Sequence, residues 1–368
     1  MRRILPFLLA VSLILGGCGS KNADAETTAA TTAPTTAPTV ATTAPTETTA
    51  APTETEPTIN WDAMSPLTGL PVDVPLNTRP FAAVINNIVY AMPQCGVRNA
   101  DILYEILAEG GITRCMAIFQ DPTKTGPIGS IRSARPYLAD LAMGYDAIFV
   151  HAGGSDDGYR KIRDLGLDHM DGISSDYSGT YYYRDQDRLN SGYDLEHTMF
   201  ITGEKLPEYA GKLNMDTTRE KNMDYGLNFA EHPDMKKGEE AKHVVVEFAN
   251  SGKTTTFTYH DDTNLYTAEQ YGTDFIDGTV QEPLSFRNLI VITADTSYDS
   301  EGYRVFIDLT DSGEGWFVCD GKMVPILWSR ENEESPFVYT LTDGTPLTLG
   351  TGKSYIAVTP YGSTVTCE

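Results

Sequence analysis

Long apolar runs and basic side chains are both scarce in this chain. No run of eighteen apolar residues occurs, which excludes an ordinary transmembrane helix. Lysine and arginine number 27 against 51 aspartates and glutamates, so the formal charge is −24. Because such a charge repels phosphates, the composition excludes general nucleic-acid binding and electrostatic adhesion to an anionic membrane surface. We expect no nucleic-acid partner.

Signatures of common cofactor-dependent and metal-dependent enzymes are also missing. No His-Glu-x-x-His zinc motif occurs, and the six histidines are scattered. Gly350-Thr-Gly-Lys-Ser354 lacks the first glycine of a P-loop, because position 347 is leucine. The sequence therefore predicts no cofactor and no metal site. We interpret the chain first as a non-enzymatic protein.

The first twenty residues predict export and lipid anchoring. Arg2 and Arg3 precede an apolar stretch from Ile4 to Leu15, which has the length of a signal-peptide core. Leu15-Gly-Gly-Cys18 resembles a bacterial lipobox, so residues 1–17 are predicted to be a signal peptide and Cys18 its lipidation site. Acyl chains on Cys18 would hold the protein on the lipid bilayer.

A linker rich in threonine, alanine and proline follows the lipobox. Residues 27–58 hold 15 Thr, 8 Ala and 5 Pro among 32 positions. Such a segment cannot offset its own ordering entropy, so residues 18–60 are predicted to be a disordered tether. A lipobox followed by a tether indicates the outer face of a Gram-positive cytoplasmic membrane, where no outer membrane limits its reach.

The remaining chain predicts two modules, an α/β module at 61–213 and a β-rich module at 243–368, with an inter-domain region at 214–242. In the first module, apolar runs alternate with helical patterns, which predicts a mixed α/β layer. Its predicted strands are 81–85, 102–109, 112–119 and 147–151, and its predicted helices are 136–143, 155–165 and 206–213. The segment 102–109 also fits a helix. Short β-branched runs after 243 predict a small, mostly antiparallel sandwich or barrel. The predicted fold class is therefore α+β or α/β.

Polar residues gather in the first module where a scaffold would use apolar ones. Arginine suits planar, bidentate recognition of carboxylate or phosphate, and a Gly-Gly turn before a capped helix start can bind anions through backbone N–H groups. The candidate ligand site consists of Arg114, Arg132, Arg135, His151, Gly153, Gly154 and Ser155. Alternatively, these arginines pair with acids such as Glu105, Glu109 or Asp140 and only brace the fold.

An enzymatic alternative uses a carboxylate and a histidine from the same module. Glu105 or Glu109 could act as general acid or base with His151 or His197, as in a peptidoglycan hydrolase or lyase. A third hypothesis is a purely structural scaffold. For the four cysteines beyond Cys18, namely Cys95, Cys115, Cys319 and Cys367, the sequence leaves disulfide pairing or free thiols open.

Six motifs occur in an order that is specific to one family. They are Ser65-Pro-Leu-Thr-Gly-Leu-Pro71, Arg79-Pro80 with Asn86-Asn87, Ala100-Asp-Ile-Leu-Tyr-Glu105, Glu109-Gly-Gly-Ile-Thr-Arg114, Arg132-Ser-Ala-Arg135 and His151-Ala-Gly-Gly-Ser155. Over roughly residues 60–360 the chain resembles the YerB-like lipoprotein family of Gram-positive bacteria, with its N- and C-terminal modules. The resemblance implies a lipid-anchored envelope protein of unknown function and supplies no catalytic residue. The chain departs at Glu196-His197-Thr198, where the family pattern is Pro-His-Asn.

The leading hypothesis from the sequence is a tethered envelope protein. It would bind an anionic cell-wall ligand or an envelope protein through the arginine- and histidine-lined face of the first module. The oligomeric state and the identity of the ligand are left open.

Overall fold

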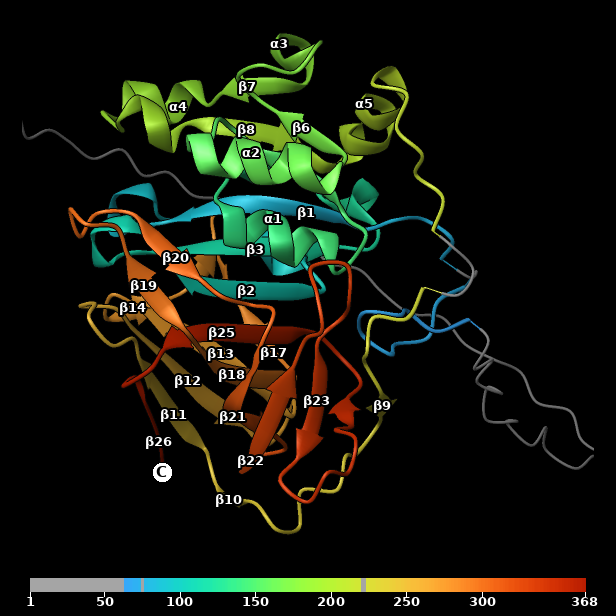
Figure 1. The fold of residues 1–368 in the computed structure, drawn as a ribbon, viewed down its shortest axis with the longest axis vertical. Coiled ribbons are helices and arrows are strands. Elements are labelled where there is room, and N and C mark those ends of the chain that lie inside the picture. The colour runs from blue at the N-terminus through green and yellow to red at the C-terminus, as the bar shows by residue number, and fades with distance from the viewer. Residues whose placement is uncertain (1–62, 74–75, 220–222) are drawn as a thin grey trace, which may run out of the picture. The chain divides into compact units, whose positions relative to one another are not determined.

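The computed structural model describes residues 63–73, 76–219 and 223–368 (Figure 1). Among these residues strands outnumber helices, and the sheets are mixed and antiparallel, consistent with an α+β fold. The predicted signal peptide, Cys18 and the linker lie outside the described residues. No helix in the described ranges is long and apolar enough to cross a membrane.

An eleven-stranded sheet forms the centre of the molecule. Its strand order is β10 (Glu239–Glu240), β22 (Lys322–Ser329), β21 (Ser312–Cys319), β18 (Asn288–Ala294), β25 (Ser354–Pro360), β2 (Ile102–Leu107), β3 (Thr113–Phe119), β1 (Phe81–Asn87), β5 (Ile148–His151) and β6 (His169–Asp171), with β23 (Val338–Leu341) paired to β22. The segment 102–109, which the sequence left between strand and helix, is thus a strand followed by a single turn.

The middle of this sheet joins strands from both predicted modules. β25 runs parallel to β2 on one side and to β18 on the other, which places Tyr355 in register with Leu103 and Leu289. Every residue of β2 and β25 is buried, as expected for strands covered on both faces. The strands of the predicted β-rich module form no sandwich or barrel of their own among the described residues. They are divided between two sheets, and the larger sheet also contains strands of the predicted α/β module. Apolar patterning identified these strands but carried no information about which strands they pair with.

One face of the large sheet packs against helices. Ala82 and Val84 of β1 share a core with Leu138 and Leu141 of α1. α1 spans Pro136–Met143 and α2 spans Asp156–Leu165, as the sequence predicted, and Figure 1 shows both on this side of the sheet. Proline suits the first turn of α1, because that position needs no N–H donor.

The opposite face packs against a second sheet. Ala83 and Ile85 of β1 share a core with Val244, Val246 and Phe257, because successive residues of a strand point to opposite faces. The second sheet has the order β14 (Thr273–Asp274), β13 (Leu265–Gln270), β12 (Thr254–His260), β11 (His243–Glu247) and β26 (Thr364–Cys367), with β17 (Ser285–Phe286) paired to β13.

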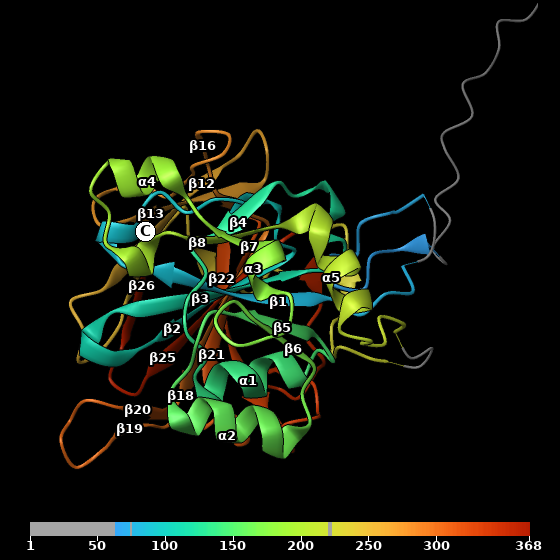
Figure 2. The same cartoon turned by 90° about the horizontal axis from the view of Figure 1, so that it is seen from above.

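The smaller elements surround these two sheets (Figure 2). A three-stranded sheet consists of β4 (Pro127–Gly129), β8 (Met199–Thr202) and β7 (Tyr182–Arg184). The short strand pairs are β15 (Ile276–Asp277) with β16 (Glu282–Pro283), β19 (Thr296–Tyr298) with β20 (Val305–Ile307), and β24 (Leu349–Gly350) with β9 (Phe229–Ala230). The remaining α-helices are α3 (Ser178–Tyr181), α4 (Gln186–Asn190) and α5 (Leu206–Lys212). Single 3-10 turns span Val89–Ala91, Val97–Asn99, Glu109–Gly111, Pro122–Lys124, Leu195–His197 and Gly203–Lys205.

The cysteines form no disulfide within the described residues. Cys95, Cys115, Cys319 and Cys367 are free thiols. Burial raises the pKa of the Cys115 thiol well above its usual range and that of Cys319 to about 12. These two thiols therefore stay protonated near neutral pH, and unreactive buried cysteines of this kind act as small apolar residues.

Candidate functional site

The three predicted arginines do not converge on one place. Arg114 on β3 donates from Nη2 to Glu109 Oε2 at 3.2 Å and from Nη1 to the Ser133 carbonyl at 2.8 Å. Arg135, directly before α1, donates to the same carboxylate through Nε and, at 3.0 Å, through Nη2. Only 9% of the Glu109 side chain is exposed. Two of the three arginines thus brace the fold through one buried carboxylate.

In this Glu109 cluster (Glu109, Arg114 and Arg135), the two arginines stabilise the charge of the carboxylate between them. Burial alone would raise the pKa of Glu109, but the hydrogen bond from Arg135 and the two positive charges outweigh it and hold that pKa below its ordinary value. Burial, assisted by the neighbouring charge of Arg135, lowers the pKa of Arg114 to about 10. At neutral pH the carboxylate is therefore ionised, and it has no proton to give as a general acid.

His151 is fully buried at the end of β5. Its Nδ1 lies 2.9 Å from the Gly153 carbonyl oxygen, and its Nε2 lies 3.0 Å from His169 Nδ1. Because a carbonyl oxygen can only accept, Nδ1 of His151 carries the proton and Nε2 accepts from His169. Burial lowers the pKa of His151 to about 4. The imidazole is therefore neutral, and both of its nitrogens are bonded inside the protein.

The Gly-Gly turn and the start of α2 are also satisfied internally. Asp171 Oδ1 accepts from the Gly153 N–H at 2.7 Å, and its Oδ2 accepts from Tyr159 Oη at 2.7 Å. Ser155 caps α2, because its Oγ accepts from the Gly158 N–H at 3.1 Å. The sequence pattern left the N-cap open between Ser155 and Asp156, and Ser155 makes it. The side-chain oxygen of Ser155 is therefore occupied by the helix itself.

We expect His151 to make stability depend on pH. Its folded pKa of about 4 lies below the unfolded value of 6.5, so the unfolded chain binds the extra proton and the free energy of unfolding falls as pH drops through this window. Through His151, the free energy of unfolding should be about 2 kcal/mol lower at about pH 5 than at about pH 7, and His151→Phe should remove this contribution. Urea unfolding at both pH values measures this difference. His243→Gln, at an exposed position, is the control and should keep the wild-type difference.

Glu105 forms a second buried carboxylate site, where residues from both halves of the chain meet. The side chain is completely buried. Four neutral donors reach its two oxygens, from Asn87 (3.0 Å), Thr113 (2.7 Å), Thr255 (2.7 Å) and Tyr355. Lys253 Nζ lies 3.3 Å from Oε1, and burial lowers the pKa of Lys253 although the charge of Glu105 opposes this. We call Glu105 with these five partners the Glu105 cluster.

The glutamate–histidine pair of the enzymatic alternative is not assembled. Glu109 is held by two arginines, and Glu105 is enclosed by its cluster. His197 Nδ1 lies 2.8 Å from Asn86 Nδ2, and burial lowers its pKa. Among the described residues, neither glutamate forms a hydrogen bond or an ion pair with His151 or His197. In the same ranges, no group of three or more His, Cys, Asp or Glu side chains could hold a metal ion.

An open groove of about 600 Å³ lies beside the Gly153–Gly154 turn. Arg132 lines it and donates from Nη2 to Glu196 Oε2 at 2.9 Å, where 51% of the Glu196 side chain is exposed. Arg184, at the end of β7, also lines the groove and donates to the Leu195 carbonyl at 2.5 Å. Of the predicted ligand residues, Arg132, Gly153 and Gly154 therefore share one open concavity, which we call the Arg132 groove. Its full lining is Ile131, Arg132, Ser133, Ala152, Gly153, Gly154, Ile173, Arg184, Asp194, Leu195, Glu196 and Met199.

Sequence reasoning missed Arg184 and Asp194 and did not assign Glu196 to the site. Arg184 reaches the groove because the three-residue strand β7 pairs with β8, which places Arg184 opposite Met199. So short a strand gives almost no periodic signal. Glu196 belongs to the segment Glu196-His197-Thr198, which differs from the pattern that the resemblance implies, and this expected difference was the available signal.

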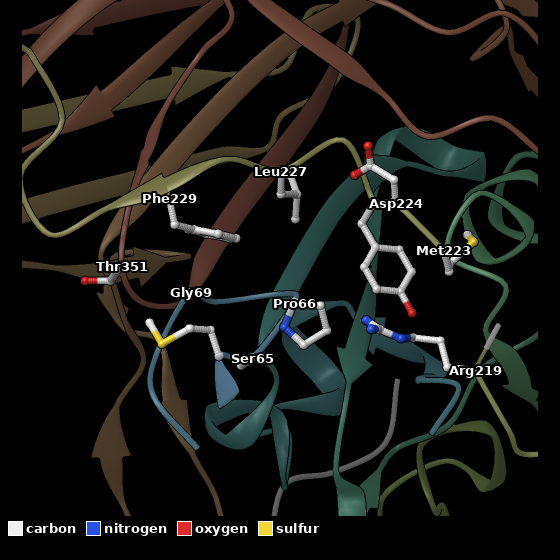
Figure 3. Close-up of a pocket in the computed structure, with 11 residues that line it drawn as sticks. Ser65, Pro66, Gly69, Arg219, Met223, Asp224, Leu227, Phe229 and Thr351 are labelled. Atoms are coloured by element: carbon white, nitrogen blue, oxygen red, sulfur yellow. The ribbon is translucent and has the colours of Figure 1, made fainter. Parts of the chain in front are cut away.

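A second pocket, of about 340 Å³, surrounds the motif at 65–71 (Figure 3). Gly69 has a φ of +63°, and a Cβ added there would lie 2.4 Å from Phe229 Cβ. The Arg219 guanidinium lies 5.8 Å from the centre of the Tyr225 ring. None of the predicted ligand residues lines this pocket. The glycine of the motif is therefore explained by close packing, because no other residue fits there.

Two family models match the chain. "Protein of unknown function (DUF3048) N-terminal domain" matches residues 67–216, and the corresponding C-terminal domain matches residues 244–356. The Arg132 groove lies within the first match, whereas the Glu105 cluster draws residues from both.

Both a curated protein and a solved structure are similar to this chain. "Putative lipoprotein YerB" of Bacillus subtilis (strain 168) is 31% identical over 302 residues, which cover 80% of this chain and 86% of that protein. "Crystal structure of YerB protein from Bacillus subtilis" matches with a TM-score of 0.71 and 28% identity, covering 82% of this chain and 99% of that chain. These matches confirm the resemblance drawn from the six motifs.

Proposed function

This chain belongs to the DUF3048 family, whose two domains are described as being of unknown function, and from that premise we propose that it is a lipid-anchored envelope protein that binds an anionic ligand. The name of its relative, a lipoprotein, supports anchoring, for which Cys18 is the proposed site. The proposed location is the outer face of the cytoplasmic membrane. The proposed ligand is a cell-wall component or an envelope protein that presents a carboxylate or phosphate group.

The accessibility of Arg132 is the observation that carries this proposal. Arg114 and Arg135 are committed to Glu109, whereas Arg132 lines an open groove with 23% of its side chain exposed. Its ion-pair partner Glu196 is half-exposed, and exposed ion pairs contribute only about 0–1 kcal/mol. An incoming anion can therefore replace Glu196 on the guanidinium at small cost.

The rest of the groove suits a ligand with a polar and an apolar part. Burial lowers the pKa of Arg184, whose guanidinium supplies a second positive group. Ile173 and Leu195 are 58% and 60% exposed at the same groove. An anionic ligand with an apolar flank would bury these side chains while its charge contacts Arg132.

Binding of soluble cell-wall fragments to the full-length protein in detergent tests the proposal. The probes are muropeptides, which carry carboxylates, and poly(glycerol phosphate), which carries phosphates. We expect saturable binding without turnover for one of them, and Arg132→Ala should weaken it at least about tenfold, or about 1.4 kcal/mol. Glu196→Gln should strengthen binding, because it removes the competing carboxylate.

Arg160→Ala is the matched control, since Arg160 lies on α2 with 62% of its side chain exposed and pairs with Asp157 outside the groove. This variant should bind as the wild type does. Equal binding by the Arg132→Ala variant, or no binding of either probe, would overturn the proposal. Release of smaller muropeptides during incubation would instead favour a hydrolase.

A further inference from the structure

The second sheet ends at β26 and leaves part of the large sheet uncovered. In the strand order β14-β13-β12-β11-β26, β26 is an edge strand among the described residues. On the large sheet, Val318 lies under the second sheet and is fully buried. Two residues earlier on the same face, Trp316 is only partly buried, and Glu314 beyond it is exposed. The face of β21 thus becomes accessible where the second sheet stops.

The hydrogen-bond ladder shows which backbone groups of β26 face outward. His243 and Glu368 exchange both of their backbone hydrogen bonds, at 2.9 Å each. In an antiparallel pair such exchanging residues alternate along the strand, so Thr366 and Thr364 also direct their N–H and C=O groups toward β11. The backbone groups of Val365 and Cys367 therefore point away from β11, at the open edge.

An apolar groove of about 710 Å³ lies directly beside this edge. Val365 and Tyr361 line it from the β26 side, and Trp316 and Leu327 line it from the large sheet. Tyr361 is 57% exposed and Leu327 is 39% exposed. Open backbone groups and an uncovered apolar face therefore occur together.

We propose that β26 is a strand-addition site, at which an extended peptide segment of a partner protein pairs with the edge of the second sheet. The added strand continues that sheet across the groove. Its backbone bonds the outward N–H and C=O groups of Val365 and Cys367, and alternate side chains of the peptide pack on Trp316 and Leu327. This site is separate from the Arg132 groove and does not depend on the function proposed there.

Charge selects the kind of peptide. Glu247 and Thr364 are exposed on the outer face of the second sheet, where the Glu247 carboxylate accepts from Thr364 Oγ1 at 2.7 Å. Peptide side chains that point away from the groove therefore lie on the face that carries this acidic group. Residues 189–368 hold 30 acidic and 13 basic side chains. This charge repels a second copy of the same chain and favours a partner segment in which apolar residues alternate with lysine or arginine.

Selection from a displayed library of random decapeptides on the full-length protein tests this inference. We expect the enriched peptides to alternate apolar and basic residues. Val365→Pro should reduce their affinity at least about tenfold, because proline removes the outward N–H while leaving the bonds to β11 intact, and edge strands tolerate proline. Val365→Thr keeps the N–H and should bind as the wild type does. Thermal unfolding of both variants checks that the fold is preserved.

Two further variants distinguish strand pairing from nonspecific hydrophobic binding. Leu327→Glu should weaken binding by placing a charge on the face that receives the apolar side chains of the peptide. Glu247→Lys, on the outer face, should shift the selection away from basic peptides. Enriched peptides without alternation, or equal binding to the Val365→Pro and wild-type proteins, would refute strand addition. Dimerisation of the protein alone through this edge, detected by sedimentation and lost in Val365→Pro, would also overturn the proposal by identifying a second copy as the occupant.

Discussion

Replacing Glu109 by glutamine is expected to lower the free energy of unfolding by about 3–5 kcal/mol, the usual cost of removing one partner from a buried ion pair. The glutamine keeps the shape of the side chain but leaves Arg114 and Arg135 facing each other without a negative charge. Arg114 is 4% exposed, and its Nε has no hydrogen-bond partner in the structure. The carboxylate is therefore the main compensation for its burial. Urea unfolding measures the change.

Glu196→Gln is the matched control for this prediction. It removes the same chemical group from an arginine partner, but the ion pair lies at the rim of an open groove. Exposed pairs of this kind contribute about 0–1 kcal/mol, so the control should unfold almost as the wild type does. If Glu109→Gln and Glu196→Gln lowered the free energy of unfolding equally, the assignment of Arg114 and Arg135 to a bracing role would be contradicted.

The second large effect is expected at Glu105. Glu105→Gln should also cost about 3–5 kcal/mol, because it leaves the buried ammonium of Lys253 without its counter-charge. Adding Lys253→Met should recover part of this loss, since the two groups are coupled and their effects are not additive. Glu282→Gln is the control, because Glu282 pairs with Arg98 at the surface and is 57% exposed.

The position of the Glu105 cluster predicts that the two modules unfold cooperatively. Glu105 lies on β2, whereas Thr255 lies on β12 and Tyr355 on β25, so the cluster ties the two predicted modules together. We expect far-ultraviolet circular dichroism and tryptophan fluorescence to report one coincident unfolding transition. Two separated transitions would show that the modules at 61–213 and 243–368 unfold independently.

Local elements were predictable because their signals lie in neighbouring residues. α1 begins at a proline, and α2 begins after a capping serine. The apolar runs predicted as strands at 81–85 and 147–151 correspond to the entirely buried strands β1 and β5, except that β5 begins at Ile148. Each of these features depends on propensity, capping or periodicity within about ten residues. The family resemblance was accessible for the same reason, because each motif is a short contiguous stretch.

The candidate site was only partly predictable, because it depends on distances between remote residues. Arg114 and Arg132 carry the same charge and stand in similar motifs, yet one is buried against Glu109 and the other lines an open groove. The partner of Arg132, Glu196, lies 64 residues away in sequence. No local sequence pattern predicts which carboxylate forms an ion pair with which arginine.

The sequence by itself determined the acidic charge, the type of most of the longer helices and strands, and the family. It also predicts the export signal. The tertiary structure alone decided that β25 lies between β2 and β18, that Glu109 holds two arginines, and that Arg132 stays accessible. The physical reason is that hydrophobic periodicity specifies which face of an element is buried, whereas strand partners and ion pairs are chosen by long-range packing among many similar candidates.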